Sequence, residues 1–243
     1  MKKLSVITIC YNDLEGLQKT VQNVLLQQRE LFEYIIIDGA SKDGTQDYLK
    51  ASADLFDVVV SEPDKGIYDA LNKGWQKSSG EFVLFMNAGD VFASSDVIEK
   101  AIPFLTEEVD IAYGDAHLSD RSGIYHTKKH PEHIASIWMI KEVIAHQSQF
   151  IRKSLLFNNN GYDLQFRIAA DYAFLAKVFW KQQVRFKYLP FVVSVFDTEG
   201  ISSSPEQKSR VEQERKAIHN AYAPFWIRFV YYTYAKINRW IGR

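Results

Sequence analysis

Short apolar runs that end at polar turns recur along the first half of the chain. Residues 82–86 are continuously apolar and lead into Asn-Ala-Gly-Asp at residues 87–90. A run of this length bounded by turn residues is typical of a buried strand. The same pattern occurs at residues 34–37, which end at Asp38. Asp38 and Asp90 therefore follow predicted strands, and open parallel sheets bind ligands at the carboxyl ends of their strands.

Segments with a helical period alternate with these strands. In the segment after the first strand, Leu17, Val21 and Val24 recur at three- and four-residue spacing, the period of a helix face packed on a sheet. The pattern predicts strands over residues 4–10, 34–37, 57–61 and 81–87, and helices over about residues 14–28 and 67–77. This alternation, with nearly continuous apolar strands, predicts an α/β fold with a mainly parallel sheet and helices on both faces.

The pattern changes after Tyr113. Strands are expected to become shorter and aromatic-rich, with a polar loop at residues 127–133, as an α+β continuation of the same sheet. The Ser-rich segment at residues 202–205 is a candidate linker. A charged helix is predicted over about residues 206–223, because Pro224 stops it.

Composition excludes several classes of protein. A chain of 243 residues can bury an ample core in one sizeable domain. With 29 Lys and Arg against 30 Asp and Glu, it has no positive field to attract nucleic acid, which is not an expected partner. The single cysteine, Cys10, excludes an internal disulfide. Residues 1–4 run directly into a short strand without the apolar segment of a signal peptide, so a cytoplasmic location is expected.

Several short motifs, in their order and spacing, resemble the inverting glycosyltransferases of family 2, which have the GT-A fold. The motifs are SVITICYN at 5–12, IDGASKDGT at 37–45, EPDKGIYDALNKG at 62–74 and NAGD at 87–90, with His146-Gln147 and residues 169–171 further on. The resemblance covers about residues 4–195, and the branch it is most similar to makes bacterial exopolysaccharide of the colanic-acid type. Neither GxGxxG nor GxxxxGK[ST] occurs, so dehydrogenase and P-loop interpretations have no local support.

The resemblance also implies how the chain is divided. A GT-A domain, a Rossmann-like mixed and mainly parallel sheet with helices on both faces, is expected at residues 1–205. Its residues 1–114 would form the nucleotide-sugar-binding half and residues 115–205 the acceptor half. Residues 206–243 would form a helical tail.

The donor site implied by the resemblance draws on the first two motifs. Thr8, Tyr11 and Asn12 would border the base, and Asp38 would contact the base or ribose. A UDP-sugar is the preferred donor, with GDP- and dTDP-sugars as alternatives. An aspartate at a strand end can instead serve as a helix cap or turn residue, and this alternative applies to Asp38 and to Asp90 taken singly.

Lys65 and Asp69 lie where the third motif opens a helix. Backbone N–H groups at a helix start and a nearby cation suit donor phosphate or ribose, and the resemblance makes this segment part of the donor site. The alternative is a solvated pair between Lys65 and Asp69, four residues apart on the helix.

Asp90 is implied to bind Mg²⁺ or Mn²⁺ that bridges the donor diphosphate, with Asn87 on the donor side. These cations prefer carboxylate, water and phosphate oxygens, and a diphosphate leaving group needs its charge neutralised. Asn87 and Gly89 occupy positions where relatives often carry aspartate. Coordination by the protein is therefore expected to be thin, with phosphate and water supplying most ligands.

Asp171 is implied to be the catalytic base, since a carboxylate within reach of an acceptor hydroxyl can take its proton in the transition state. Arg167, four residues earlier, is expected to help keep it ionised. Asp163 competes for the role, although it is better suited to a turn. His146 and Gln147 would line the acceptor or diphosphate side, or His146 would be a structural histidine.

The tail predicts an amphipathic helix. Its apolar face holds Trp226, Phe229, Val230, Tyr234, Ile237, Trp240 and Ile241, and its opposite face holds Arg228, Lys236, Arg239 and Arg243. The charges and the short length argue against a membrane span. The pattern favours either peripheral binding to the inner face of the cytoplasmic membrane or docking on the catalytic domain or a partner.

Together these features predict a glycosyltransferase that moves a sugar from a nucleotide-diphosphate sugar to a lipid-linked or growing polysaccharide acceptor, in cell-surface polysaccharide biosynthesis and with inversion. A noncatalytic nucleotide-sugar-binding subunit is the alternative from another class, because the metal motif is thinned. A nucleotidyltransferase is disfavoured, because no Gly-rich, Arg-containing loop follows the first strand.

Overall fold

The computed structural model describes residues 2–120, 122–198 and 207–240, with only the backbone at 197, 235 and 237–240. One nine-stranded sheet runs through these residues in the order β3-β2-β1-β4-β8-β6-β9-β5, and β7 pairs with β6. The strands are β1 (Leu4–Cys10), β2 (Phe32–Asp38), β3 (Val58–Ser61), β4 (Phe82–Phe85), β5 (Val91–Phe92), β6 (Ile111–Asp120), β7 (Gly123–Lys128), β8 (Gln149–Arg152) and β9 (Phe186–Asp197).

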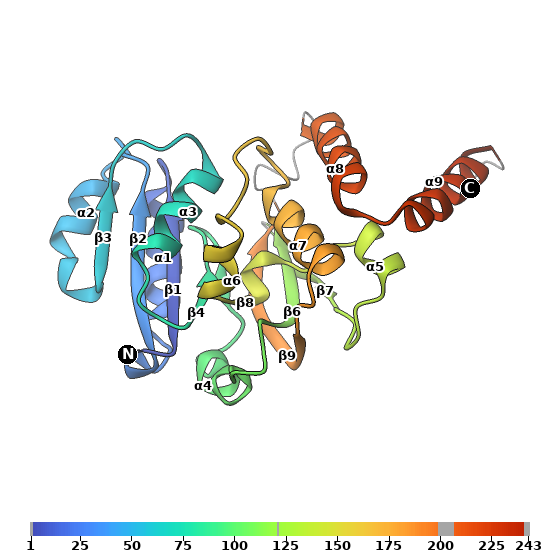
Figure 1. Cartoon of the computed structure of the whole chain (residues 1–243). Helices are drawn as coiled ribbons and strands as arrows, with labels where there is room; N and C mark the ends of the chain where they lie inside the picture. The colour runs from blue at the N-terminus through green and yellow to red at the C-terminus, as the bar shows by residue number, and fades with distance from the viewer. Residues whose placement is uncertain (1, 121, 199–206, 241–243) are drawn as a thin grey trace.

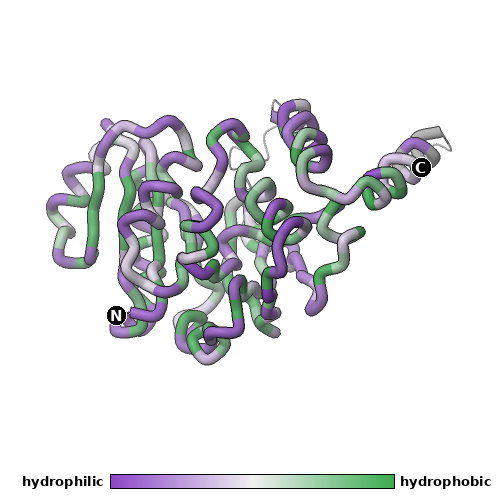
Figure 2. Tube along the Cα trace, viewed as in Figure 1, coloured by the Kyte–Doolittle hydropathy of each residue, from purple (hydrophilic) through white to green (hydrophobic). Residues whose placement is uncertain are grey.

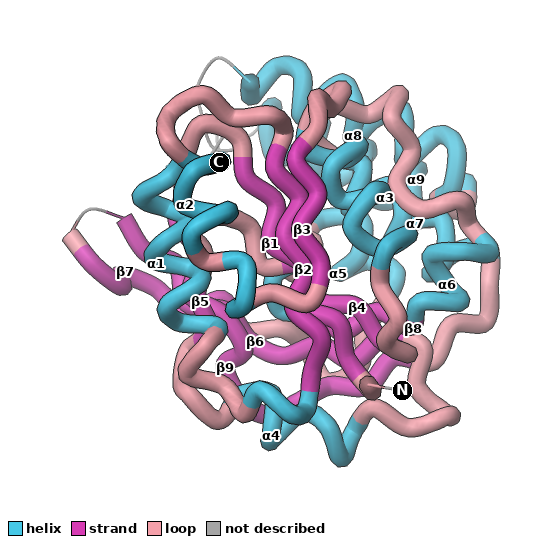
Figure 3. Tube along the Cα trace, turned by 90° about the vertical axis from the view of Figure 1, so that its left-hand side faces the viewer, coloured by secondary structure: helices cyan, strands magenta, loops and turns pink. Residues whose placement is uncertain are grey.

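Helices cover both faces of this sheet (Figures 1 and 3). The α-helices are α1 (Leu14–Val24), α2 (Thr45–Ala51), α3 (Ile67–Lys77), α4 (Val97–Ala101), α5 (Ser136–Lys141), α6 (Lys153–Asn158), α7 (Ala170–Lys181), α8 (Lys208–Tyr222) and α9 (Phe225–Trp240). One core packs α3, α6 and α7 on the sheet, and the other packs α1, α2 and α4 on the opposite face. Figure 2 shows the mostly hydrophobic strands between these layers. The predicted α/β class is confirmed.

The register of the parallel strands brings the two predicted strand-end loops together. β1 lies between β2 and β4 and runs parallel to both, with Cys10 opposite Asp38. Beyond β4, the backbone N–H of Ala88 donates to the carbonyl of Ile9. The end of β1 is therefore flanked by Asp38 on one side and by residues 87–90 on the other.

The second half of the sheet differs from its prediction. β6 and β9 have 10 and 12 residues and are not short strands. The outer part of β6 is only partly buried, because it continues past the core as a hairpin with β7. Polar residues on such an edge conceal a strand from a search for apolar runs.

The boundaries of the helices also shift. α1 ends at Val24, short of residue 28, and a 3₁₀ turn at Arg29–Leu31 follows. The charged helix is present as α8, and α9 begins directly after Pro224. The predicted linker at 202–205 lies outside the described residues.

α9 extends away from the sheet at the C-terminal end of the chain (Figure 1). Ile227 is buried against Ile140 of α5 and Ala223. Among the described residues, no helix combines the length and apolar character needed to cross a membrane.

Candidate active site

The loop after β4 is held by α1. The hydroxyl of Thr20 donates to the carbonyl oxygen of Asp90 at 2.7 Å, and the backbone N–H of Gly89 donates to the carbonyl of Gly16. Gly89 has a φ of 93°, a left-handed conformation that glycine adopts without strain. These contacts fix the side chains of Asn87 and Asp90 at the end of the sheet.

Two neighbouring residues from the second half of the chain reach this loop. Gln147 donates from Nε2 to Oδ2 of Asp90 at 3.0 Å. Asn87 lies with Nδ2 3.0 Å from Nε2 of His146. Because an amide nitrogen can only donate, Nε2 of His146 is the acceptor in this contact. The predicted residues Asn87, Asp90, His146 and Gln147 are thus in one cluster.

Asp171 lies at the start of α7 on the other side of His146. Nδ1 of His146 is 3.6 Å from Oδ2 of Asp171, and the hydroxyl of Tyr68 is 2.9 Å from Oδ1. Burial acts to raise the pKa of Asp171, but His146, the backbone N–H of Tyr172 and the hydroxyl of Tyr68 together lower it below its ordinary value. The side chain keeps 20% of its surface exposed. Asp171 is therefore an ionised carboxylate open to a ligand.

The cationic neighbour expected beside Asp171 was Arg167, and this expectation was wrong. α7 begins only at Ala170, so the four-residue spacing does not put Arg167 one helical turn from Asp171. Arg167 is exposed, and its backbone N–H donates to Glu214. His146 is the side chain next to Asp171 in its place.

Glu214 of α8 holds the segment that precedes Asp171. Its carboxylate accepts hydrogen bonds of 3.0 Å from the backbone N–H groups of Arg167, Ile168 and Ala169. Only 11% of its side chain is exposed. Charge-assisted bonds to three consecutive N–H groups fix the backbone that leads into Asp171.

Two residues that were predicted to contact the nucleotide base and ribose lie beneath the surface. The hydroxyl of Thr8 is 3.1 Å from that of Tyr34, and Thr8 is fully buried. Asp38 is also fully buried and accepts hydrogen bonds from the hydroxyls of Ser41 and Ser61. These side chains shape the loop above them, and their contact with a donor stays a prediction.

Tyr11 and Asn12 form the exposed part of this region. Asn12 has a φ of 49°, accepts from the backbone N–H of Lys42, and donates its own N–H to Ser41. A Cβ on Gly39 would lie 2.5 Å from Oδ2 of Asp64 and 3.0 Å from the ring of Tyr11. The tyrosine ring therefore lies beside a carboxylate.

Protein carboxylates occupy the start of α3. Asp69 accepts a hydrogen bond from the backbone N–H of Lys65, and Asp64 accepts one from that of Gly66. These two N–H groups are accordingly not available to a phosphate. The cation paired with Asp69 is Lys73, at 3.7 Å, so the alternative of a Lys65–Asp69 ion pair is replaced by a Lys73–Asp69 pair.

The loop at 87–90 offers oxygen ligands of the kind that Mg²⁺ and Mn²⁺ prefer. Oδ1 of Asn87 is buried and has no hydrogen-bond partner among the described residues. The carboxylate of Asp90 lies in the same loop. Across all the residues that the structure describes, no group of three or more His, Cys, Asp or Glu is arranged to hold a metal. The two side chains fit a divalent cation that takes its other ligands from substrate and water.

Sequence reasoning missed three residues of this region: Tyr68, Asp64 and Glu214. Tyr68 and Asp64 lie inside the motif at residues 62–74. The hydroxyl of Tyr68 and the carboxylate of Asp64 could have been recognised there as candidate site groups. Glu214 gave no signal, because a lone glutamate in a charged helix is most often a solvated residue.

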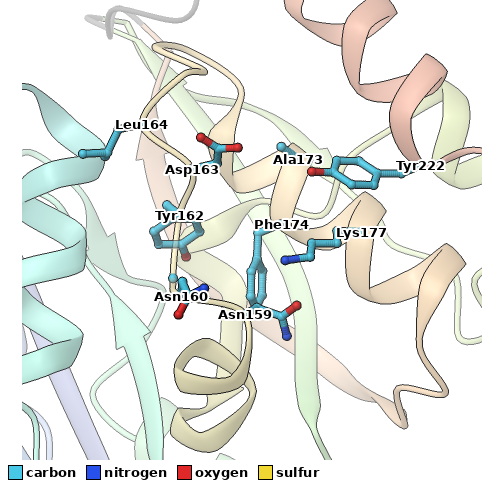
Figure 4. A pocket seen from close by; sticks show the side chains of 10 residues that line it. Asn159, Asn160, Tyr162, Asp163, Leu164, Ala173, Phe174, Lys177 and Tyr222 are labelled. Carbon is cyan, nitrogen blue, oxygen red and sulfur yellow. The ribbon is translucent and has the colours of Figure 1, made fainter.

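A pocket of about 390 Å³ lies beside this cluster, between the loop before α7, α7 itself and α8 (Figure 4). Its walls are mostly polar and are formed by Asn159, Asn160, Gly161, Tyr162, Asp163, Leu164, Ala173, Phe174, Lys177 and Tyr222. The ring of Tyr162 is 5.7 Å from that of Tyr68, whose hydroxyl contacts Asp171, so these two rings connect the pocket with this carboxylate. Asp163 accepts from the backbone N–H of Gln165, as expected of a turn residue.

Comparison with known sequences identifies one family. The sequence profile described as "Glycosyl transferase family 2" matches residues 5–182. An uncharacterised glycosyltransferase of Mycobacterium tuberculosis is 34% identical over 241 residues, which is 96% of this chain and 90% of the relative.

Solved structures share the fold. Staphylococcus aureus TarS 1–349 in complex with UDP-GlcNAc superposes with a TM-score of 0.68 and 18% identity over 90% of this chain. A mannosyltransferase from Pyrobaculum calidifontis in complex with GDP-Man and Mn²⁺ gives a TM-score of 0.62 and 20% identity over 91% of this chain. The chain spans 66% and 62% of these two structures, slightly less than two thirds of each.

Proposed function

The chain belongs to glycosyl transferase family 2, and we propose that it moves a sugar from a nucleotide-diphosphate sugar to a lipid-linked or growing polysaccharide, with inversion at the anomeric carbon. One observation carries the proposal. His146 links the loop of Asn87 and Asp90, which suits a diphosphate, to the ionised carboxylate of Asp171. A base and a leaving-group site on two sides of one imidazole suit the direct displacement of a diphosphate by a hydroxyl.

Asp171 is the proposed base of this displacement. The acceptor oxygen forms a bond to the anomeric carbon while the bond from that carbon to the diphosphate oxygen breaks, and the acceptor proton passes to Asp171. The hydroxyl becomes strongly acidic only as the new bond forms, so a carboxylate within hydrogen-bond reach is basic enough. The lowered pKa of Asp171 keeps it ready to accept a proton at neutral pH.

A divalent cation, Mg²⁺ or Mn²⁺, is part of the proposal. Asp90 would hold it through a carboxylate oxygen and Asn87 through Oδ1. When bound, the cation neutralises charge on the departing diphosphate. Support comes from Oδ1 of Asn87, which has no hydrogen-bond partner within the described part of the chain, and from the Pyrobaculum mannosyltransferase, whose structure contains Mn²⁺.

The proposed donor is a UDP-sugar. The TarS structure contains UDP-GlcNAc, which favours uridine, while the mannosyltransferase contains GDP-Man, so GDP- and dTDP-sugars remain candidates to be tested. Tyr11 and Asn12 are proposed to contact the nucleotide base of the donor. Thr8, Asp38, Lys65 and Asp69 are proposed to act by shaping the loops that hold it.

The proposed acceptor is a saccharide that extends past the reacting sugar. The polar pocket beside Tyr162 combines amides, Asp163, Lys177 and aromatic side chains, a lining that suits a polyhydroxylated ligand. It belongs to the proposed acceptor half, residues 115–205, except for Tyr222. A cell-surface polysaccharide, with exopolysaccharide of the colanic-acid type as one candidate, is the proposed product.

The test is nucleotide release from a panel of nucleotide sugars, with lipid-linked and water-soluble acceptors compared. Acceptor-dependent release that disappears in Asp171→Asn supports the transferase. Tight nucleotide binding without release, in the parent as in the variant, would instead favour the noncatalytic nucleotide-sugar-binding subunit. The proposed location, the cytoplasmic side of the inner membrane, depends on α9 and has its own test below.

A further inference from the structure

α9 has two apolar faces, and among the described residues only one of them packs against the rest of the fold. On the inner face, Ile227 is 2% exposed and packs against α5. On the outer face, Phe225, Trp226 and Phe229 are 74%, 62% and 62% exposed. A helix that had only to dock on its own domain would need the first face alone. The two alternatives predicted for the tail, docking on the catalytic domain and binding to a membrane surface, are therefore compatible.

A crevice continues this outer face toward the catalytic domain. It has a volume of about 220 Å³, lies between α5 and α9, and is almost entirely apolar. It is lined by Ile137, Lys141, Val230, Tyr231 and Tyr234. The ammonium group of Lys141 lies 5.4 Å from the centre of the Tyr234 ring, at the crevice. An apolar crevice with a cation beside it suits an acyl chain that ends in an anionic head group.

Charge along this part of the chain has one sign. The last 29 residues, 215–243, contain six Lys and Arg and no Asp or Glu, although the whole chain has a net charge of −1. Lys236, on α9, and Lys141, on α5, are both exposed. Basic side chains next to exposed Trp, Tyr and Phe are the composition of helices that lie at the surface of anionic lipid.

Contacts within the protein fix the orientation of this surface. His219 of α8 lies 2.9 Å from the hydroxyl of Tyr172 and 2.8 Å from that of Tyr232, so it joins α7 to α9. Arg215 donates to the carbonyl oxygens of Ile140 and Lys141 at the end of α5. The outer face of α9 is thus held at a set angle to the domain.

The surface also lies near the proposed catalytic groups. Lys141 lies at the crevice and His146 lies beside Asp171. The two residues are five positions apart, and an extended chain of that length spans at most about 18 Å. A lipid whose chain lies at the crevice would therefore present its head group within a few sugar lengths of Asp171.

We propose that the outer face of α9, with the crevice between α5 and α9, docks the protein on an anionic lipid bilayer. Phe225, Trp226 and Phe229 enter the boundary between head groups and acyl chains, and a lipid chain fills the crevice. Lys141 and Lys236 contact the anionic heads. This proposal rests on the proposed function and deepens it, since it assigns the membrane contact to named residues. Its failure is distinguishable from that of the transferase activity, because bilayer binding is measured on the full chain in the absence of donor and acceptor.

The test is flotation of the full chain with phosphatidylcholine vesicles that contain or lack phosphatidylglycerol. We expect binding to the anionic vesicles that weakens at about 1 M salt, where the Debye length is about 3 Å. The double variant Trp226→Ser/Phe229→Ser should lower the partition coefficient at least about tenfold, because each large side chain loses its burial in lipid. Lys141→Gln/Lys236→Gln should weaken binding to the anionic vesicles alone.

Phe157→Ser is the matched control, since Phe157 is a 69% exposed phenylalanine on α6. It should float as the parent does, and all variants should keep the parent's circular dichroism. The proposal is overturned if the parent does not float with anionic vesicles, or if the double variant floats equally well. It is also overturned if sedimentation shows a dimer that only the double variant abolishes, because a second copy would then cover this face.

Discussion

The hydroxyl of Tyr68 lies 2.9 Å from Oδ1 of Asp171, although 103 residues separate the two in the sequence. This contact joins α3, in the proposed donor half, to the start of α7, in the proposed acceptor half. Burial and the charge of Asp171 raise the pKa of Tyr68 well above its usual value, so the hydroxyl keeps its proton. It can therefore act as a permanent donor to the base, or to the nearby carbonyl of Ile168.

Tyr68→Phe should slow turnover by about 10- to 100-fold, because Asp171 loses a contact that holds its carboxylate in position. Its hydroxyl is one of the groups that lower the pKa of Asp171, so its removal raises that pKa. The acidic limb of the pH profile of kcat should accordingly move to higher pH. Tyr48→Phe, on α2, is the control and should leave this limb in place.

Asp171→Asn should reduce kcat by about 10² to 10⁴, the usual contribution of a general base, while donor affinity is retained. Single-turnover kinetics and donor titration separate the two effects. Asp163→Asn removes a carboxylate that closes a nearby turn and lines the proposed acceptor pocket, so it should raise the acceptor KM but keep most of kcat. If Asp163→Asn loses more turnover than Asp171→Asn, the roles of the two residues are exchanged.

Asp90→Ala should abolish the increase in UDP affinity that Mn²⁺ produces, because it removes the carboxylate proposed to hold the cation. Calorimetric titration of UDP with and without Mn²⁺ measures this coupling. Asp54→Ala, an exposed position on the 3₁₀ turn Ala53–Leu55, is the control. Equal affinity of Asp90→Ala and the parent for UDP with Mn²⁺ would show that the metal site lies elsewhere.

Glu214→Gln should reduce kcat more than it changes donor affinity, because a neutral amide holds the N–H groups of residues 167–169 less strongly than a carboxylate does. Glu212→Gln, an exposed position on the same helix, should behave as the parent. Truncation after residue 205 should also cost turnover, whereas truncation after residue 224 should retain it. A fully active protein ending at residue 205 contradicts the role given to Glu214.

Stability should fall as pH is lowered from about 6.5 to about 4, partly through two buried histidines. Burial lowers the pKa of His130 to about 4, and burial together with the charges of Arg215 and Arg228 does the same for His219. Below pH 6.5 the unfolded chain binds protons at these positions that the folded chain does not, so each histidine destabilises the fold by up to about 3 kcal/mol at pH 4.

Urea unfolding of His219→Gln and the parent at about pH 7 and about pH 4.5 tests this linkage. The variant loses the bonds of His219 to Tyr172 and Tyr232 and should be less stable at pH 7. Its deficit should shrink by about 2 to 3 kcal/mol at the lower pH. A deficit that does not change with pH would mean that His219 is not neutral in the folded protein.

Local pattern was enough to predict that Asp38 and the loop at 87–90 lie close together. Asp38 and the loop at 87–90 are neighbours because parallel strands share one carboxyl edge, so two strand ends found in the sequence had to meet near β1. Which side chains face a ligand did not follow from the same pattern. Every residue of β1 is buried, including the polar Ser5 and Thr8, so the sequence of this strand gave no sign that Thr8 points beneath the site.

The surroundings of Asp171 were harder to predict, because they depend on contacts between distant segments. Arg167 was the nearest cation in the sequence, yet the backbone turns before α7 and His146 lies beside the base instead. Tyr68 and Glu214 reach the same place from α3 and α8. Such contacts depend on how helices pack, and no periodicity within one segment reports on that.

The bonds that Glu214 makes to residues 167–169 can form only late in the synthesis of the chain. These contacts span 45 to 47 residues toward the C-terminus, whereas β1 to β4 and their helices are complete by residue 85. Because a chain is made from its N-terminus, these strands and helices leave the ribosome before α8 does. The segment before Asp171 gains its last support only after α8 has emerged, so a nascent chain that ends before residue 214 lacks all three of these bonds.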